Sequence, residues 1–311
     1  MRYAEHHCRT NLTLLEGGSH ADELVTQAVE LGYAALAITD RNSLAGIVRA
    51  YAAAKESGLK LLYGAEITPT DGPPVVLLAT DRRAYGRLSR LLTLGRRRTT
   101  KGNCELQVAD IAEHHQGLLA TVVPTYQPHW QPAEETAAVH TYRDIFDDRC
   151  YLLGELHYGT ADGRRLDGLL QLAKATNVPL VAAGDVHYHI PARMPLQHVL
   201  TAIRHGTTVA ELGQRRLPNA ERHLRTLAEL QAVFARVPAA IRRTLEVADR
   251  CTFSLDELRY EYPRELSPPG ETPLEYLRRL AWLGARQRYG KIPDKVAAQL
   301  EHELQIINEL K

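Results

Sequence analysis

The sequence lacks several patterns by which common classes of protein are recognised. Its four cysteines, at positions 8, 104, 150 and 251, form no CxxC pair, which argues against a zinc finger and against a framework of disulfide bonds. No apolar stretch approaches the roughly 18 residues of a membrane helix, and the N-terminus has no charged segment that leads into an apolar one. We therefore expect a soluble, cytoplasmic protein with reduced thiols and no membrane partner.

The sequence also has no excess of charge. It contains 38 Lys and Arg residues against 37 Asp and Glu residues, and a net charge of +1 gives no global field for nucleic acid or membrane. Contact with a polyanion must then be local, and the basic run 95–102 is the candidate, although a solvated loop is the alternative interpretation. The residues of this run that could contact phosphates or DNA are Arg96, Arg97, Arg98 and Lys101.

Hydrophobic residues are plentiful, at 44%, and they are arranged in a β/α rhythm. Strands that are apolar throughout are buried on both faces, which predicts a parallel sheet or barrel covered by helices. Helical segments such as 43–57 and 163–176 separate most of the expected strands. These strands are expected at 34–39, 59–68, 74–80, 118–123, 150–156 and 179–188.

No strand is expected after about residue 194. The proline-rich stretch YEYPRELSPPGETP, residues 260–273, is the candidate domain boundary, and we interpret the chain as a piece of a longer protein. Walker, nucleophile-elbow and dinucleotide-binding motifs are absent. Helical periodicity predicts helices near 194–204, 221–235, 238–251, 273–289 and 294–310.

Side chains that bind metals recur where the strand-like runs end. Asp185 and His187 stand two apart in VAAGDVHYH, so both point to the same face of a strand. Asp40 in AITDRNS and Glu66 in YGAEIT take similar places, and the carboxyl ends of strands form the active site of parallel barrels. This edge of the barrel is therefore predicted to hold a metal site or an acid–base site.

The N-terminal stretch HHCRTNLTLLE combines metal-ligand types with a fixed cation. His7 and Cys8 precede Arg9, and Glu16 follows a few residues later. A guanidinium stays protonated in proteins, so Arg9 would repel any metal ion placed beside it. The stretch begins as a metal site would and is interrupted by this arginine.

Taken in order, these segments resemble a known family. The succession HHCRTNLTLLEGGS, LGYAALAITDRNSLAGIVRAY, GLKLLYGAEIT, PLVAAGDVHYH, VLTAIRHGTTV and LPNAERHLRT is similar to the N-terminal polymerase-and-histidinol-phosphatase (PHP) domain of bacterial C-family DNA polymerases, most of all the error-prone DNA polymerase III alpha-type enzyme. The resemblance implies an α/β fold with a distorted (β/α)7 TIM-like barrel over about 1–193. A helical extension over about 194–258 would complete a PHP domain of residues 1–258.

The same resemblance implies that the tail 259–311 is a linker and the start of the polymerase region. The parent protein would be a DNA-directed DNA polymerase that uses magnesium, and its catalytic residues would lie outside these 311 residues. No catalytic residue is therefore expected in the chain itself. DNA would be the partner through the full-length polymerase, together with a sliding clamp and translesion accessory proteins.

In the family, up to three metals at the strand ends support phosphoester hydrolysis. Arg9 and Arg41 stand where the family has histidine, and residues 122–124 offer no ligand atom where it has cysteine or histidine. Asp40 is kept as a neighbouring acid. The positions that keep a ligand type are His7, Glu16, Glu66, His157, Asp185 and His187.

The resemblance thus implies a degenerate metal site with no tightly bound metal and a mainly structural role in an error-prone polymerase of translesion synthesis and DNA repair. The alternatives are an active phosphoesterase or 3'-5' exonuclease with one zinc, manganese or magnesium ion, and a stand-alone PHP phosphatase. In place of a metal, we expect Arg41 to pair with Glu16, Glu66 or Asp185.

Overall fold

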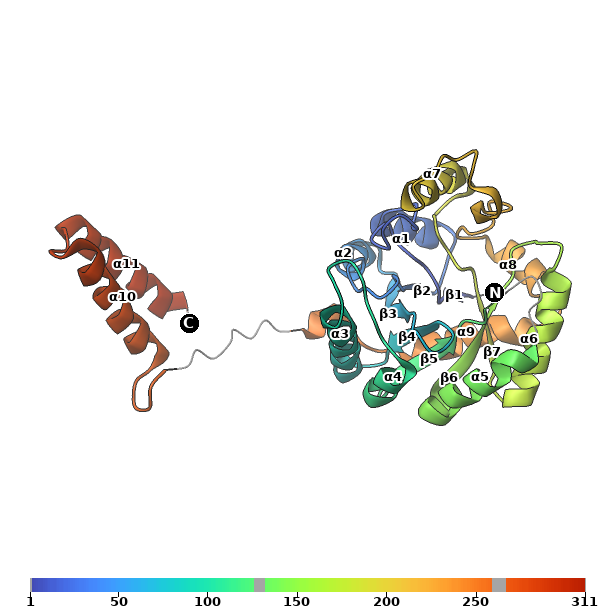
Figure 1. Cartoon of the computed structure of the whole chain (residues 1–311), viewed down its shortest axis with the longest axis horizontal. Helices are drawn as coiled ribbons and strands as arrows, with labels where there is room; N and C mark the ends of the chain where they lie inside the picture. The colour runs from blue at the N-terminus through green and yellow to red at the C-terminus, as the bar shows by residue number, and fades with distance from the viewer. Residues whose placement is uncertain (1, 126–131, 259–266, 311) are drawn as a thin grey trace. The chain divides into compact units, whose positions relative to one another are not determined.

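The computed structural model describes residues 2–125, 132–258 and 267–310, and the chain divides into two compact units, Met1–Leu258 and Arg259–Lys311. In the first unit, seven strands form one sheet that curls into a nearly closed barrel with helices around it (Figure 1). The six strands expected from the sequence are confirmed, and the short β1 was not predicted. In sheet order, the strands are β1 (Ala4–Glu5), β2 (Ala35–Ile38), β3 (Lys60–Ile67), β4 (Val75–Ala79), β5 (Leu118–Val122), β6 (Cys150–Glu155) and β7 (Leu180–Ala183).

Helices cover the outside of the barrel and one of its ends. None of the helices in the described ranges is long and apolar enough to cross a membrane. The helices of the first unit are α1 (Ala21–Glu30), α2 (Ile47–Ser57), α3 (Arg82–Arg97), α4 (Val108–His114), α5 (Pro132–Phe146), α6 (Asp162–Thr176), α7 (Met194–Arg204), α8 (Leu227–Val233) and α9 (Pro238–Arg250).

One strand runs against the direction of the others. β1, β2 and β3 are parallel, as are β5, β6 and β7, but β4 is antiparallel to both of its neighbours. The predicted parallel sheet or barrel therefore contains one antiparallel strand, β4. The cause is the short link 68–74, which contains three prolines, because a parallel return needs a crossover of about a dozen residues or more.

The barrel closes where the chain leaves β1 and β7. Cys8 and Val186 form a parallel bridge just beyond these strands. Val186 N donates to His7 O at 2.8 Å, and Arg9 N donates to Val186 O at 2.9 Å. These bonds bring the N-terminal stretch HHCR beside the carboxyl end of β7.

The end of the barrel interior that lies away from the carboxyl end of β7 is apolar, and α9 covers it. Thr244 of α9 accepts a hydrogen bond from Ala4 N at 3.2 Å, which ties the helix to β1. Part of the region after residue 194 thus closes one end of the barrel. The buried interior cluster consists of Ala4, Ala35, Ala37, Leu62, Val76, Leu78, Leu119, Tyr151, Val181, Val247, Ala248 and Cys251.

The helix predicted over 221–235 is shorter in the structure. α8 begins only at Leu227, after Thr226 accepts a hydrogen bond from Glu229 N as the N-cap. The residues before it lie alongside the end of β7 instead, where Tyr188 forms a parallel bridge with His223. The segment 221–225 therefore belongs to the same edge of the barrel as Asp185.

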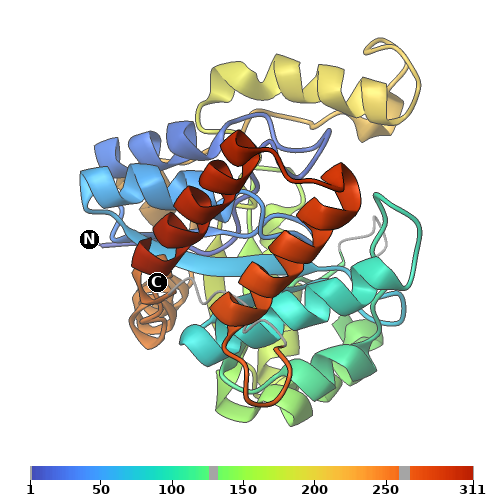
Figure 2. The same cartoon turned by 90° about the vertical axis from the view of Figure 1, so that its left-hand side faces the viewer.

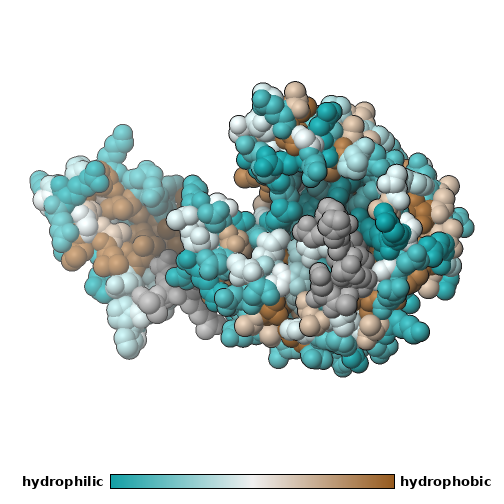
Figure 3. Space-filling model, turned by 45° about the vertical axis from the view of Figure 1, so that its right-hand side comes forward, coloured by the Kyte–Doolittle hydropathy of each residue, from teal (hydrophilic) through white to brown (hydrophobic). Residues whose placement is uncertain are grey.

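The second unit is a pair of helices, α10 (Pro273–Tyr289) and α11 (Asp294–Leu310), which lie side by side (Figure 2). Arg278 pairs with Glu301 across them at 2.8 Å. Among residues 267–310, only Ala285 and Leu304 are buried. Hydrophobic residues (brown) accordingly gather on the surface of this unit, whereas hydrophilic residues (teal) cover most of the visible face of the first unit (Figure 3).

Candidate functional site

Acidic side chains gather at the carboxyl ends of the barrel strands. Because side chains alternate along a strand, Glu66 shares the face of Leu62, and Glu155 shares the face of Tyr151, both in the barrel interior. Asp185 follows β7 at the same edge. All three acids are buried, with exposed fractions of 2%, 3% and 5%. The interior thus changes from apolar near α9 to acidic at this edge.

Arg9 lies among these acids. Its Nε donates to Glu66 Oε2 at 2.8 Å, and its Nη1 lies 2.5 Å from Asp185 Oδ1 and 2.6 Å from His187 Nε2. The arginine side chain is only 6% exposed. Three of the ligand positions implied by the resemblance therefore already bind one buried guanidinium.

The protonation of these neighbours follows from burial and from Arg9. Burial raises the pKa of Glu66, but the charges of Arg9 and His7 outweigh it and hold this pKa well below its usual range. Burial, and then Arg9, lower the pKa of His187 to about 3. A neutral imidazole can accept a hydrogen bond at Nε2, which agrees with the contact that Arg9 makes there.

Arg41 lies at the outer edge of the group. Its Nη1 donates to Glu16, which also accepts from Arg204 at the end of α7. Its Nε lies 3.6 Å from Glu66 Oε2, and its side chain is 36% exposed. The expected pairing of Arg41 with an acid is found at Glu16, but the buried central position belongs to Arg9.

Asp40 is buried and bound by threonines. Its carboxylate accepts from Thr10 N at 2.7 Å, from Thr10 Oγ1 at 2.9 Å and from Thr13 Oγ1 at 2.7 Å. Burial raises its pKa, and the hydrogen bonds from Thr13 and Thr10 oppose this shift. Asp40 therefore ties the loop after β1 to the end of β2, and the structure does not bring it into the group around Arg9.

His7 and Glu155 form a second part of the site. His7 Nδ1 lies 2.6 Å from Glu155 Oε1 and 3.7 Å from Asp185 Oδ1. His7, Glu155 and Asp185 could hold a metal ion, since one ligand atom from each lies within 4.8 Å of the others. Sequence reasoning missed Glu155, although it is the next-to-last residue of the strand-like run CYLLGEL, a place similar to that of Glu66 in YGAEIT.

Arg222 also contacts the site and was not predicted. Its Nη1 pairs with Asp185 Oδ2, and Arg165 Nη2 lies 3.9 Å from Glu155 Oε2. Burial is the main cause that lowers the pKa of Arg222 to about 10. The negative charge of Glu155 opposes this shift, and the positive charges of Arg9, Arg165 and Arg225 add to it. The motif LPNAERHLRT contributed to the family resemblance, but it gave no signal that pointed to this one residue.

His157 lies at the edge of the site and contacts backbone. Its Nε2 lies 3.1 Å from Gly184 O, and its N donates to Asp162 Oδ2 at 2.8 Å. Burial, and then Arg222, hold the pKa of His157 well below its usual range. The imidazole is therefore neutral and donates from Nε2 to the carbonyl.

The basic run expected to contact phosphates divides into two pairs. Arg96 donates to Asn42 O at 2.8 Å, and Arg98 pairs with Asp110, so both are engaged within the fold. Arg97 and Lys101 are exposed. These two stay candidates for contact with an external phosphate.

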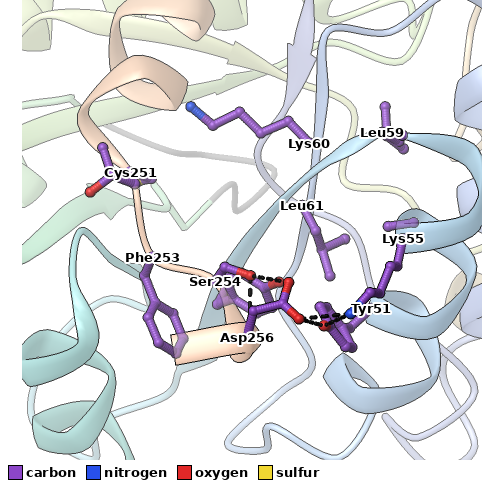
Figure 4. Close-up of a pocket in the computed structure, with 13 residues that line it drawn as sticks. Tyr51, Lys55, Leu59, Lys60, Leu61, Cys251, Phe253, Ser254 and Asp256 are labelled. Atoms are coloured by element: carbon purple, nitrogen blue, oxygen red, sulfur yellow. Dashed lines mark hydrogen bonds and ion pairs between the residues drawn. The ribbon is translucent and has the colours of Figure 1, made fainter. Parts of the chain in front are cut away.

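A cavity of about 320 Å³ lies at the opposite end of β3 from Glu66 (Figure 4). Lys55 Nζ pairs with Asp256 Oδ1 at 2.7 Å, and the hydroxyl of Tyr51 also donates to Asp256. Lys60 Nζ donates to Ala248 O at 2.7 Å. The polar groups drawn in this pocket thus satisfy one another or the backbone, and they do not converge on a reaction centre.

Comparisons with known proteins agree with the motif resemblance. Residues 5–153 match the sequence profile of the family described as "PHP domain". The chain is 49% identical over 320 residues to an error-prone DNA polymerase from Rhodopirellula baltica, covering 100% of the chain and 28% of that protein. It is also 49% identical to an error-prone DNA polymerase from Aromatoleum aromaticum, covering 99% of the chain and 29% of that protein.

A more distant similarity concerns a solved structure. It is described as a candidate metal-dependent phosphoesterase from Bifidobacterium adolescentis, with 16% identity and a TM-score of 0.46 over 76% of this chain and 96% of that one. Residues 5–153 are thus similar to the PHP-domain family, and they form most of the strands of the seven-stranded barrel. The chain is similar to one segment of these polymerases over nearly its whole length, and it spans less than a third of the length of the two relatives described above.

Proposed function

We propose that this chain is the PHP region of an error-prone DNA polymerase of translesion synthesis or DNA repair, with a degenerate metal site and a mainly structural role. The observation that carries the proposal is the position of Arg9. Its guanidinium contacts Glu66 at 2.8 Å, Asp185 at 2.5 Å and His187 at 2.6 Å. These contacts lie at the carboxyl ends of the strands, which form the mouth of the barrel. The same three residues are ligand positions in the family resemblance.

The arrangement around Arg9 does not suit a cluster of metal ions. Metal-assisted hydrolysis uses cations to polarise the phosphoryl group and to generate hydroxide near neutral pH. Arg9 already engages Glu66, Asp185 and His187, and an arginine keeps its charge in proteins. An added cation would meet that charge at short range. The residues present therefore do not fit a hydrolytic metal cluster.

An active phosphoesterase or 3'-5' exonuclease is the second candidate. It is favoured by one observation, the buried group of His7, Glu155 and Asp185, which could hold one zinc, manganese or magnesium ion. Such an ion would polarise a phosphoryl oxygen when bound. A stand-alone PHP phosphatase is less well supported, because the sequence match to polymerases extends over the whole chain.

Metal content and hydrolysis distinguish the two candidates. The chain would be purified without chelators and analysed for bound elements, and then assayed on a generic phosphoester and on a labelled single-stranded oligonucleotide with Mn²⁺, Zn²⁺ or Mg²⁺. The degenerate metal site predicts less than one tightly bound metal per chain, and the structural role predicts no metal-dependent hydrolysis. Hydrolysis that requires the metal and is abolished in Glu155→Gln would establish the phosphoesterase instead.

Partners and location are part of the same proposal. In the longer protein, DNA would bind through the polymerase with its magnesium, and a sliding clamp and translesion accessory proteins would be further partners in the cytoplasm. Within this chain, exposed Arg97 and Lys101 are the residues of the basic run that could contact a DNA phosphate.

A further inference from the structure

Both carboxylate oxygens of Asp185 are engaged by arginines. Arg9 Nη1 lies 2.5 Å from Oδ1, and Arg222 Nη1 pairs with Oδ2. Arg222 is not one of the positions at which the family resemblance places a ligand or a replaced ligand. It comes from the segment 221–225, which precedes α8 and follows β7 by more than thirty positions in the sequence. A second, independent part of the chain thus supplies a cation to the same acid.

The backbone holds Arg222 beside the site. Its carbonyl oxygen accepts from His187 N at 2.9 Å and from Tyr188 N at 3.3 Å. Three residues later, Arg225 is 1% exposed and donates from Nη2 to Leu156 O at 2.7 Å. The segment is therefore fixed against both β6 and the end of β7, and the side chain of Arg222 starts from a defined place.

Arg222 and Arg9 differ in their access to solvent. The side chain of Arg222 is 25% exposed, whereas that of Arg9 is 6% exposed. Glu155 is the neighbouring acid that favours the charged form of Arg222. Arg222 thus lies at the mouth, close to two of the three residues, Glu155 and Asp185, that could hold a metal ion with His7.

We propose that Arg222 keeps divalent cations out of the group formed by His7, Glu155 and Asp185. The inference rests on the proposed function, because it explains why the last remaining set of ligands would hold no metal. A metal ion on Asp185 would have to compete with an arginine at each of the two carboxylate oxygens. The ion would also add two charges to a space that already contains Arg9 and Arg222, where repulsion is strong because little water is present to screen it.

Removal of Arg222 has a specific consequence. It frees Asp185 Oδ2 and takes one positive charge from the mouth, while the buried contacts of Arg9 with Glu66 and with Oδ1 can remain. Loss of Arg204 is the matched control, because it also takes one positive charge from the mouth but contacts Glu16 instead of Asp185. The two variants separate a local effect on the ligands from a general effect of charge.

The test is metal binding by Arg222→Gln, Arg222→Ala and Arg204→Ala in the full 311-residue chain. Mn²⁺ and Zn²⁺ would be titrated by calorimetry, and the rise in unfolding temperature with added metal would be measured in parallel. We expect both Arg222 variants to bind one ion at least about tenfold more tightly than the parent, since metal affinity depends on ligands that are free to coordinate. Arg204→Ala should behave like the parent, and Glu155→Gln added to Arg222→Gln should remove the gain.

Several outcomes would overturn the inference. One is a folded Arg222→Gln, verified by circular dichroism, that binds metal no more tightly than the parent; this variant keeps a long polar side chain and serves if Arg222→Ala does not fold. Another is a parent protein that already holds one ion on His7, Glu155 and Asp185 without hydrolysis, which would leave the structural role intact. Metal-dependent hydrolysis by the parent would instead refute the proposed function itself.

Discussion

Arg9 Nη1 lies 2.5 Å from Asp185 Oδ1, although the two residues are 176 positions apart in the sequence. The pairing depends on barrel closure, because Arg9 N donates to Val186 O and so fixes the start of the chain against the end of β7. An ion pair at this place also neutralises part of a buried acidic group. The closure of the barrel and the charge balance of its mouth are therefore linked through one residue.

Arg9→Ala should destabilise the first unit more than Arg41→Ala does. Loss of Arg9 leaves Glu66 and Asp185 buried with one fewer cation, and breaking a buried pair costs about 3–5 kcal/mol. Arg41 is 36% exposed, and exposed pairs contribute about 0–1 kcal/mol. Urea unfolding at low and high salt measures both losses, with the exposed Arg97→Ala as the control. Equal stability of parent and Arg9→Ala would show that Arg9 does not hold the site together.

The double variant Arg9→His and Arg41→His should bind more divalent metal than the parent. It restores the two histidines that the family resemblance implies, and a neutral imidazole offers a lone pair where a guanidinium offers none. Elemental analysis after dialysis against Mn²⁺ or Zn²⁺ would count the ions per chain, with Arg9→Lys and Arg41→Lys together as the charge-preserving control. An unchanged metal content in a folded double variant would mean that these arginines do not exclude the metal.

The free energy of unfolding should decrease as the pH falls from about 6.5 to about 4. Burial lowers the pKa of His6 to about 4, and burial with Arg9 lowers that of His187 to about 3. Both imidazoles then stay neutral in the folded state while they gain a proton in the unfolded state, so acid favours unfolding. Glu66 adds a further loss at lower pH, because its pKa is held below the unfolded value despite burial.

Two buried acids act in the opposite direction. Burial raises the pKa of Glu5 and of Asp40, so each contributes some stability as the pH falls through its raised value. Urea unfolding across the pH range measures the balance. His187→Gln should flatten the slope between about pH 4 and 6.5, whereas His302→Gln, on an exposed position of α11, should leave it unchanged. A slope that His187→Gln does not alter would refute the assignment.

A chain that ends at Leu258 should fold, and a chain that ends at Val237 should not. The first contains the complete compact unit, whereas the second lacks α9, whose buried side chains cover the apolar end of the barrel. The buried side chains of α9 are Ala240, Ile241, Thr244, Val247 and Ala248, and of these Val247 and Ala248 belong to the apolar barrel interior. Circular dichroism and the cooperativity of urea unfolding distinguish the two chains. A cooperative transition in the shorter chain would show that α9 is dispensable to the barrel.

The sequence alone determined the local elements and the kinds of residue at the strand ends. Short apolar runs predicted β2 to β7, because a strand buried on both faces must be apolar along its length. Prolines and a glycine marked the stretch 260–273, and the boundary between the two compact units lies close to it, after Leu258. The arginines at positions 9 and 41 were also visible as fixed charges among ligand-type residues, since that property belongs to the residue itself.

Only the tertiary structure decided which of these residues meet. β4 is antiparallel to its neighbours, and α9 covers one end of the barrel. Both features depend on contacts between segments that are distant in the sequence. Sequence spacing did not reveal that Arg9 would be buried while Arg41 stayed at the edge, or that Arg222 and Glu155 would join Asp185. Burial and ion pairing arise from contacts between residues far apart in the chain, and those contacts exist only once the barrel has closed.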